Sequence, residues 1–379
     1  MGDTPFLALH EPRFEGREWE YVKDCLDTGW VSSAGAYVHR FEEALAAAAG
    51  TRHAVAVVNG TSALHLALMA VGVSRSDLVI VPALTFIATA NAVSYCGASP
   101  VFVDSELPSL GMSPDAVDDF LHRCVPGPQG PVHQPSGRRV AACVPMHTFG
   151  HPVRMDALAT VCEHWGVPVV EDAAEALGST WRSRPCGSLG RLGTLSFNGN
   201  KIVTTGGGGA ITTNDDALAH QIRHWSTQAK VPHPWRTIHD EVGYNYRMPN
   251  INAALGLAQI ERLPDLVARK RCIASWYAEA LADSEAALCA EPDGSHSNYW
   301  LVCALVPDGR RDEVLADLQA ARVGARSVWD LLPEAGLHPG AITNTHPVAQ
   351  ELERRLVSLP SSPQLTRADV ERTVAALRR

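Results

Sequence analysis

Lysine is scarce in this chain, so the position of each lysine is informative. The 379 residues include only four lysines, Lys23, Lys201, Lys230 and Lys270, against twenty-eight arginines. A lysine amine can lose its proton and act as a nucleophile, whereas an arginine guanidinium stays protonated. Lys201 lies in "SFNGNKIVTTGGGGA", shortly before four glycines that permit close approach of the backbone. Chemistry that needs a free amine is therefore assigned to Lys201, and a surface location is expected for Lys23 and Lys270.

Two other short segments carry groups that would suit a charged ligand. Asn59-Gly60-Thr61-Ser62 follows a strand-like run and opens a helix, so its N–H groups and hydroxyls could bind a phosphate. Taken alone, the same residues favour an ordinary helix N-cap. Asp172 ends the apolar run "VPVVED", where a carboxylate could hold a protonated ring nitrogen or cap a helix. Both segments fall at strand exits, which is where ligands bind in open parallel sheets.

A phosphate site, a ring-nitrogen carboxylate and a lone lysine together describe a site for pyridoxal 5′-phosphate (PLP). The lysine forms a Schiff base with the aldehyde, and the ring then accepts electrons from a developing carbanion. Phe86, at another strand exit in "ALTFIATAN", is expected to stack on the ring, although it would also be unremarkable as a core aromatic. The four glycines precede a strand-like segment rather than a helix, so a nicotinamide site is not expected there.

The elements that must position these residues alternate between strand and helix patterns. Apolar runs separated by helical segments predict strands, which are listed here by residue number: 53–58, 77–82, 100–104, 138–147 and 165–172. Such strands predict an α/β fold with a mostly parallel sheet covered on both faces, with an antiparallel α+β arrangement as the alternative. Residues 126–137 are expected to form an exposed turn-rich loop. We predict a large domain at 1–260 and a smaller α+β domain at 261–379, with the first ~20 residues packing on the small domain.

Composition argues against several classes of partner. The net charge is −9 and no basic run occurs, which disfavours nucleic acid and anionic membranes. No apolar run reaches the ~18 residues of a membrane helix, and nine cysteines without CxxC spacing suit a reducing cytoplasm. His147 and His151 have the spacing of zinc ligands on a helix, but Gly150 and Pro152 oppose a helix there, so no metal is expected.

Seven segments in one order give the chain a family resemblance. They are "CLDTGWVSS", "VVNGTSALHLAL", "VPALTFIATANAV", "PMHTFGHP", "VVEDAAEALGS", "SFNGNKIVTTGGGGA" and "GYNYRMPNINAALGLAQIERL". With these the chain resembles the DegT/DnrJ/StrS-type sugar aminotransferases, which are fold-type I PLP enzymes. It looks closest to the C-4 aminotransferases of bacillosamine and legionaminic-acid pathways, which act on nucleotide-linked 4-keto-6-deoxy-2-acetamido sugars.

The resemblance implies a role for each matching residue. Lys201 would be the Schiff-base lysine and proton carrier, Asp172 would pair with the ring nitrogen, and Phe86 would stack. The residues implied to hold the phosphate are Gly60, Thr61, Ser62 and Ser196. Asn245 would reach the phosphate of a neighbouring subunit, which implies a homodimer with shared active sites. The residues implied to bind the sugar nucleotide are His147, Thr148, Arg247, Asn298 and Tyr299.

Two positions depart from the family pattern. Glu175 stands near the expected phenolic oxygen of the cofactor, where much of the family has Gln or His, and a carboxylate there would repel a phenolate unless it is protonated or turned away. Gly207 stands where "GEGG" is common.

The resemblance implies transfer of an amino group, from L-glutamate, to carbon 4 of a nucleotide-linked keto sugar for cell-surface glycan or sialic-acid-like sugar synthesis. One alternative is a PLP-dependent dehydratase of the same fold, which is associated with His in place of the lysine. The other is a non-catalytic PLP-binding regulator, which would be expected to carry a DNA-binding module.

Overall fold

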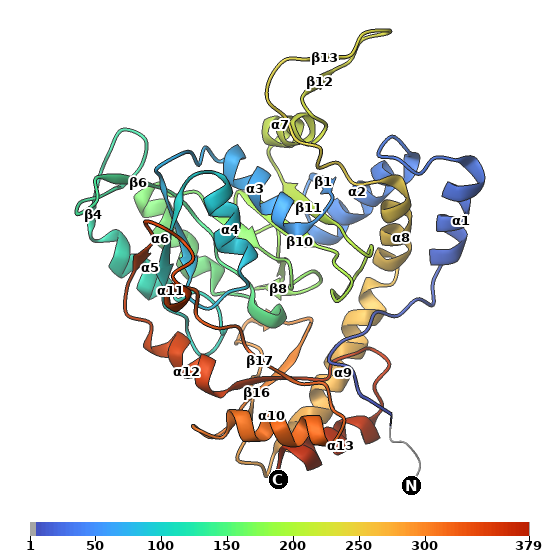
Figure 1. Cartoon of the computed structure of the whole chain (residues 1–379), viewed down its shortest axis with the longest axis vertical. Helices are drawn as coiled ribbons and strands as arrows, with labels where there is room; N and C mark the ends of the chain where they lie inside the picture. Colours follow the sequence, from blue (N-terminus) through green and yellow to red (C-terminus); the bar gives the residue numbers. More distant parts are fainter. Residues whose placement is uncertain (1–4, 379) are drawn as a thin grey trace.

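The computed structural model describes residues 5–378 and is built around one long, curled sheet (Figure 1). Its strands are β1 (His53–Val57), β2 (Leu78–Pro82), β3 (Ser99–Val103), β6 (Arg138–Cys143), β7 (Val170–Asp172), β10 (Leu192–Ser196) and β11 (Gly209–Thr213). Their spatial order is β3-β2-β6-β7-β10-β11-β1, in which a parallel bridge between Cys143 and Val169 joins β6 to β7. Only β11 in this set runs antiparallel to its neighbours. The predicted mostly parallel sheet is therefore confirmed.

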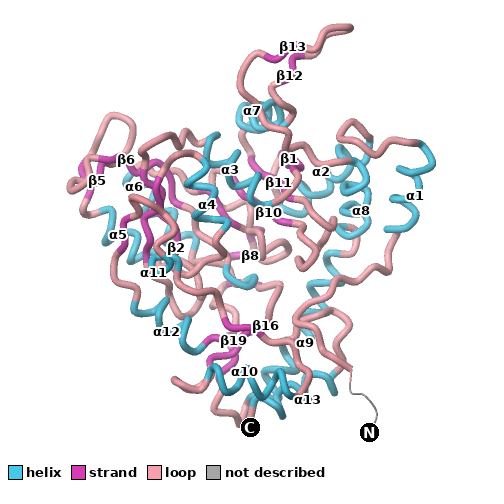
Figure 2. Tube along the Cα trace, in the orientation of Figure 1, coloured by secondary structure: helices cyan, strands magenta, loops and turns pink. Residues whose placement is uncertain are grey.

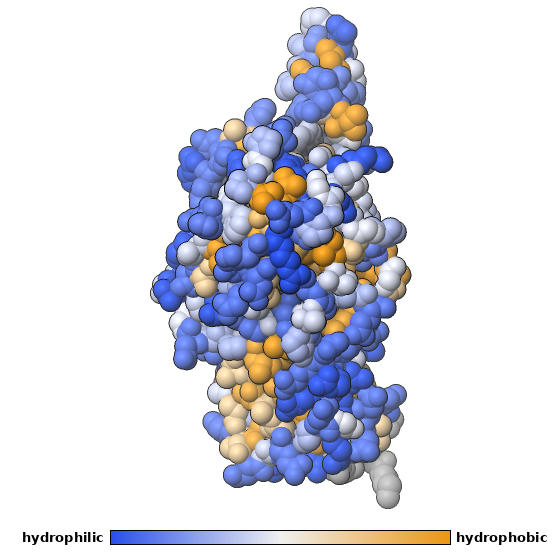
Figure 3. Space-filling view, turned by 90° about the vertical axis from the view of Figure 1, so that its left-hand side faces the viewer, coloured by the Kyte–Doolittle hydropathy of each residue, from blue (hydrophilic) through white to orange (hydrophobic). Residues whose placement is uncertain are grey.

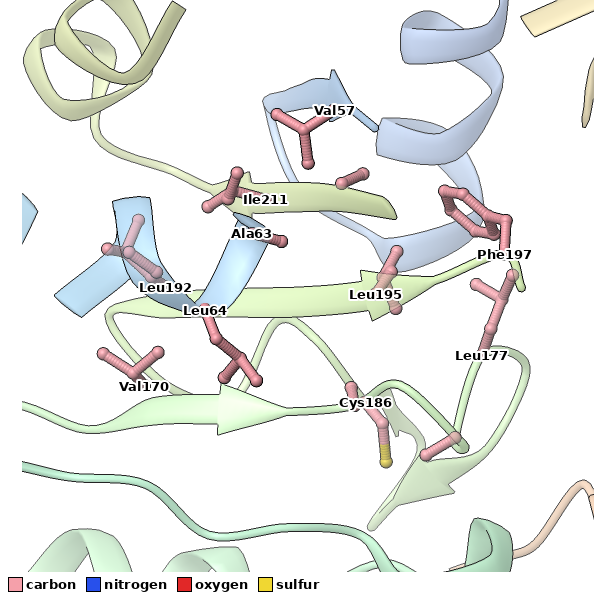
Figure 4. Packing of buried hydrophobic residues seen from close by; sticks show 14 of the residues in the cluster. Val57, Ala63, Leu64, Val170, Leu177, Cys186, Leu192, Leu195, Phe197 and Ile211 are labelled. Atoms are coloured by element: carbon pink, nitrogen blue, oxygen red, sulfur yellow. The ribbon is translucent and has the colours of Figure 1, made fainter. Parts of the chain in front are cut away.

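Burial on both faces explains why the strands are apolar along their whole length. In β2, Leu78 and Ile80 belong to one hydrophobic cluster, whereas Val79 and Val81 belong to another. All four side chains are completely buried, because successive residues of a strand point to opposite faces of the sheet. Figure 4 shows part of the larger cluster, in which Leu64 of α3 lies over Leu192 and Val170 of neighbouring strands.

Helices supply the two covering layers. Those associated with the larger cluster include α2 (Ala36–Ala49), α3 (Gly60–Ala70), α4 (Ala88–Tyr95), α7 (Asp216–Ser226) and α8 (Asn250–Ile260). The other face is covered by α5 (Pro114–Leu121) and α6 (Met155–Trp165). The first helix, α1 (Glu18–Thr28), packs against α8 at the end of this part of the molecule.

The C-terminal third forms a second, smaller core. Its sheet is antiparallel and consists of β14 (Ala287–Leu288), β16 (Val302–Leu305), β19 (Leu356–Leu359) and β17 (Arg326–Ser327), in that order. Its helices are α9 (Leu263–Leu281), α10 (Arg311–Ala320) and α13 (Arg367–Leu377). Leu7 belongs to this core and bridges to Val323, so the N-terminal segment packs here. Lys270 of α9 is 1% exposed, so the expected surface location is wrong: its amine donates to the carbonyls of Trp300 (2.9 Å) and Ser361 (2.6 Å).

Part of the chain after residue 330 returns to the large sheet. Its elements are α11 (Leu332–Ala335), β18 (Ile342–Thr343) and α12 (Pro347–Arg355). β18 pairs in parallel with β3, and Leu332, Ala349 and Leu352 join the larger cluster. The segment from residue 331 to 352 therefore packs on the large sheet, although in sequence it lies between β17 and β19 of the small one.

Short strands form the remaining structure. Within the segment predicted as a turn-rich loop, β5 (Val132–His133) pairs antiparallel with β6, and β4 (Cys124–Val125), just before that segment, pairs antiparallel with β5. A small separate sheet contains β8 (Thr180–Trp181), β9 (Arg184–Pro185) and β15 (Ser295–His296).

β12 (Lys230–Val231) and β13 (Ile238–His239) form a hairpin that projects beyond α7 (Figures 1 and 2). The same projection stands clear of the body in profile (Figure 3), and Trp235 on it is 84% exposed. Within residues 5–378, no helix is both long and apolar enough to cross a membrane.

Candidate active site

A cavity of about 230 Å³ opens at the carboxyl ends of the central strands. Asp172 and Ser196 are the last residues of β7 and β10, and Asn59 and Phe86 follow β1 and β2. Of the predicted site residues, the structure brings seven to this cavity: Gly60, Thr61, Phe86, Asp172, Glu175, Ser196 and Lys201. Parallel strands deliver their C-terminal residues to one edge, which explains how segments so distant in sequence meet.

Lys201 lies in the loop after β10 with its amine held inside the cavity. Its Nζ donates to Glu175 Oε1 at 3.1 Å and lies 3.8 Å from the ring centre of Trp300. The side chain of Lys201 is 13% exposed, so the amine is accessible from the cavity but shielded from bulk solvent. Burial raises the pKa of Glu175 although Lys201 and the Phe149 N–H oppose this shift. The amine is thus held by one carboxylate and one aromatic face.

Asp172 is a buried carboxylate without a cationic side chain bonded to it. Its Oδ2 accepts from Thr89 Oγ1 at 2.7 Å, and its Oδ1 accepts from the Ala174 N–H at 3.2 Å. Among the described residues it forms no salt bridge, and burial raises its pKa despite these donors. A carboxylate so far from water is stabilised by a positive partner. A protonated ring nitrogen entering the cavity would be that partner, so Asp172 fits a pyridine cofactor.

The N-terminus of α3 forms another wall of the cavity. Asn59 is the N-cap, and its Oδ1 accepts from the Ser62 N–H at 2.7 Å. A Cβ placed at Gly60 would lie 2.9 Å from the Ser196 Cβ, so only glycine lets the helix start this close to β10. Thr61 and Ser196 line the cavity here, whereas Ser62 does not. The helix end thus has a cap and still presents its positive dipole to the cavity, which suits a phosphate.

The comparisons with known proteins agree with this geometry. The model of the DegT/DnrJ/EryC1/StrS aminotransferase family matches residues 12–378. The chain belongs to this family. It is 39% identical to GDP-perosamine synthase of Caulobacter vibrioides, over 100% of this chain and 99% of that one. It is 37% identical to GDP-perosamine synthase of Escherichia coli O157:H7, over 96% of each chain.

Solved structures of relatives share the whole fold. DesI, determined with its TDP-sugar product, superposes with a TM-score of 0.87 at 31% identity, over 99% of this chain and 93% of that one. The aminotransferase TlmJ from Streptoalloteichus hindustanus gives a TM-score of 0.90 at 28% identity, over 99% and 98% of the two chains. The protein is a PLP-dependent nucleotide-sugar aminotransferase with the fold-type I architecture.

The two predicted sugar-binding residues near strand β6 do not line the cavity of this aminotransferase. The ring of His147 bonds to Glu171 at 3.0 Å and accepts from the Val153 N–H at 3.1 Å. Because Nδ1 accepts this N–H, it carries no proton, so the ring is the neutral Nε2–H tautomer and donates to Glu171. Thr148 is completely buried beside it. Both nitrogens of His147 are therefore engaged within the fold.

Three further predicted residues also have their side chains engaged elsewhere. Arg247 pairs with Glu42. The Asn298 side chain is completely buried, donates to two backbone carbonyls including that of Glu175, and accepts from the Trp300 N–H at 2.7 Å. Tyr299 packs in the smaller core. Asn298 thus holds the backbone of Glu175 and Trp300, the two residues whose side chains contact the Lys201 amine. Its own side chain supports the cavity and does not line it.

The remaining predicted residues have simple placements. Asn245 is exposed at the base of the projecting hairpin, where its backbone bridges to Thr227, and it does not line the cavity of its own chain. Gly207 does line the cavity, and a Cβ there would meet no heavy atom within 4 Å. A larger residue would therefore fit at position 207. Where relatives with "GEGG" have a glutamate side chain, this chain has open space.

Sequence reasoning missed several side chains that shape the site, among them two tryptophans and a threonine. Trp300 and Trp329 come from the C-terminal third and line the cavity. Thr89 does not line it but donates a hydrogen bond to Asp172. Phe86 is 51% exposed and lies edge-on to Trp329, with 6.2 Å between ring centres. Thr89 follows Phe86 by three residues at the start of α4, so helical spacing could have indicated it. No local pattern marks either tryptophan.

Proposed function

We propose that this aminotransferase moves an amino group from L-glutamate to carbon 4 of a nucleotide-linked 4-keto-6-deoxy sugar. Support comes from the relatives named GDP-perosamine synthase, which are 34 to 39% identical over nearly the whole chain. Their names favour GDP as the nucleotide. A 2-acetamido group on the sugar, and a role in cell-surface glycan or sialic-acid-like sugar synthesis, remain predictions.

The observation that carries the proposal is a shielded lysine amine in one cavity with a buried, cation-free carboxylate. PLP, when bound, supplies an electron sink that makes the carbon bearing the nitrogen acidic. Asp172 would hold the ring nitrogen protonated, and Thr61 and Ser196 would bind the phosphate at the N-terminus of α3. Lys201 would attach the cofactor aldehyde and, once released, move the proton to and from the substrate carbon.

Glu175 is placed to assist Lys201. Its Oε1 accepts from the amine, and its Oε2 accepts from the Phe149 N–H at 2.9 Å. Burial raises the pKa of this carboxyl group, which favours the neutral acid when the amine moves away. A neutral Glu175 would not repel a phenolate oxygen, as a carboxylate at this position would.

We also propose a homodimer with active sites shared across the interface. Asn245 is exposed, does not reach the cavity of its own chain, and lies at the base of a hairpin that extends away from the body (Figure 2). A second copy would receive it. Measuring the mass in solution by light scattering tests the dimer, and a monomer with full activity would refute the shared site.

The test of the function is a reaction with defined substrates. Purified protein with PLP and L-glutamate would be supplied with GDP- and UDP-linked 4-keto-6-deoxy sugars, with and without a 2-acetamido group. We expect formation of 2-oxoglutarate and a sugar product bearing an amine, detected by mass spectrometry, and no product from Lys201→Ala. Loss of water from the sugar without amine gain would instead indicate the dehydratase. Cofactor binding without any reaction would indicate the regulator.

A further inference from the structure

A second cavity, of about 430 Å³, lies against the one that holds Lys201. The two share Asn200, Trp300 and Trp329 as lining residues, so they meet at the tryptophan side chains. Trp300 presents its ring to the Lys201 amine at 3.8 Å and fixes its own orientation by donating from Nε1 to the Asn200 carbonyl at 2.7 Å. The Trp300 indole therefore separates a ligand in the second cavity from the reactive amine.

The charge of this second cavity is positive. Arg326 of β17 lines it and is exposed, and its side chain makes no hydrogen bond or salt bridge to any described residue. Arg326 is paired in register with Ser358 of β19, so the two side chains lie on the same face of the small sheet. Among residues 5–378, no Asp or Glu lines the cavity, although the chain as a whole carries a net charge of −9. An unpaired arginine in an acid-free hollow attracts an anion.

His10 supplies a second, independent sign of a ligand. It also lines this cavity, and both of its ring nitrogens are buried without a hydrogen-bond partner among residues 5–378. Buried polar atoms in native proteins are almost always hydrogen-bonded. Burial holds the pKa of His10 well below its usual range, so the ring is neutral and offers one N–H donor. An acceptor group placed in the cavity would satisfy it.

We propose that this cavity, formed by Arg326, His10 and the walls of Trp300 and Trp329, binds a carboxylate of the amino donor. The inference rests on the proposed function and names the subsite that the donor uses. A guanidinium matches a carboxylate in a bidentate arrangement, and the indole walls suit the methylene groups of a dicarboxylic amino acid. A pyrophosphate shares the same anionic chemistry, so the experiment must separate the two sources.

The experiment compares both half-reactions of the holoenzyme. Arg326→Gln, Arg326→Lys and His10→Phe would be assayed by the change in cofactor absorbance, with glutamate in one direction and the nucleotide amino sugar in the other. We expect Arg326→Gln to raise the KM for glutamate about 10- to 100-fold, with a smaller increase for Arg326→Lys. The limiting rate and the KM for the nucleotide sugar should change less than about threefold. Arg75→Gln, at an exposed arginine without a bond to any described residue, is the matched control.

A binding measurement complements the kinetics. Calorimetric titration of each variant with glutarate, a dicarboxylate without an amine, should show weaker binding in Arg326→Gln and His10→Phe than in wild type and Arg75→Gln. If wild type fails to react with glutamate yet binds glutarate through Arg326, the proposed donor is wrong while the subsite stands. A loss confined to the nucleotide sugar would assign the cavity to a pyrophosphate and overturn the inference. Equal losses in both half-reactions, or none in either, would overturn it as well.

Discussion

Replacing Asp172 by Asn should separate stability from cofactor binding. Asn has the same shape and can keep one acceptor for Thr89 or the Ala174 N–H, but it removes the charge. Because burial raises the pKa of Asp172, the folded protein binds the proton more tightly than the unfolded chain does. The stabilising contribution is then present below the unfolded pKa and is lost as pH rises through the folded pKa. At pH 7 without cofactor, Asp172→Asn should therefore melt at the same temperature as wild type or higher.

With cofactor bound, wild type should melt at a higher temperature than Asp172→Asn. Removing one member of a buried charge pair costs about 3–5 kcal/mol, which corresponds to roughly 100- to 4,000-fold weaker binding. Wild type gains melting temperature with rising PLP concentration by mass action, and the variant should gain much less at equal concentration. The assay is thermal melting at several PLP concentrations, together with an absorbance titration of cofactor binding.

Asp77→Asn is the matched control for this prediction. Asp77 is also buried, but it is paired with Arg139 at 2.6 Å. Burial opposes its ionisation, yet Arg139 and Ser74 outweigh burial and lower its pKa, so this carboxylate stabilises the fold at neutral pH. Asp77→Asn should lower the melting temperature and leave cofactor affinity unchanged. If Asp172→Asn instead melted early without cofactor and bound PLP as wild type does, the assignment of Asp172 to the ring nitrogen would be refuted.

Three further substitutions test other parts of the account. Gly60→Ala should weaken PLP binding about tenfold in an absorbance titration, because its Cβ would lie 2.9 Å from the Ser196 Cβ and displace the start of α3; unchanged affinity would contradict this. Asn298→Ala should lower the free energy of unfolding by about 3–5 kcal/mol in urea denaturation, because three buried backbone groups lose their partner. A loss of sugar affinity with full stability would instead favour a direct contact between Asn298 and the substrate. For Lys270, burial lowers the pKa to about 7, so the unfolded chain binds more protons between that pH and the ordinary value of 10.5. The difference in unfolding free energy between wild type and Lys270→Met should therefore rise from pH 7 to 9 by up to about 1.4 kcal/mol per pH unit, and a flat difference would contradict the buried neutral amine.

The parts of the site predicted from sequence are those fixed by strand order. Asp172, Ser196 and Phe86 lie at or just beyond strand ends, and a parallel sheet brings such ends to one edge whatever the details of packing. Lys201 was found because its residue type is rare in a chain that otherwise uses arginine. These arguments need only the local pattern and the class of fold.

The parts that sequence did not predict depend on contacts between distant segments. Trp300 and Trp329 reach the cavity because the C-terminal third packs across it, a contact spanning about a hundred residues or more. Lys270 lies in a helix with an ordinary amphipathic pattern, and only the carbonyls of Trp300 and Ser361 make its buried position tolerable. Motif membership likewise did not reveal that the side chain of Asn298 turns inward to backbone groups.

The most direct test of the central claim is to locate the covalent attachment of the cofactor. Sodium borohydride reduces a C=N link between PLP and a lysine to a permanent amine, so digestion and mass spectrometry can identify the modified residue. The chain has only four lysines to distinguish. We predict the added mass on the peptide that contains Lys201, its disappearance when glutamate is added before reduction, and its absence in Lys201→Ala. Modification of Lys23, Lys230 or Lys270 in place of Lys201, or none at all in protein supplied with PLP, would contradict the account.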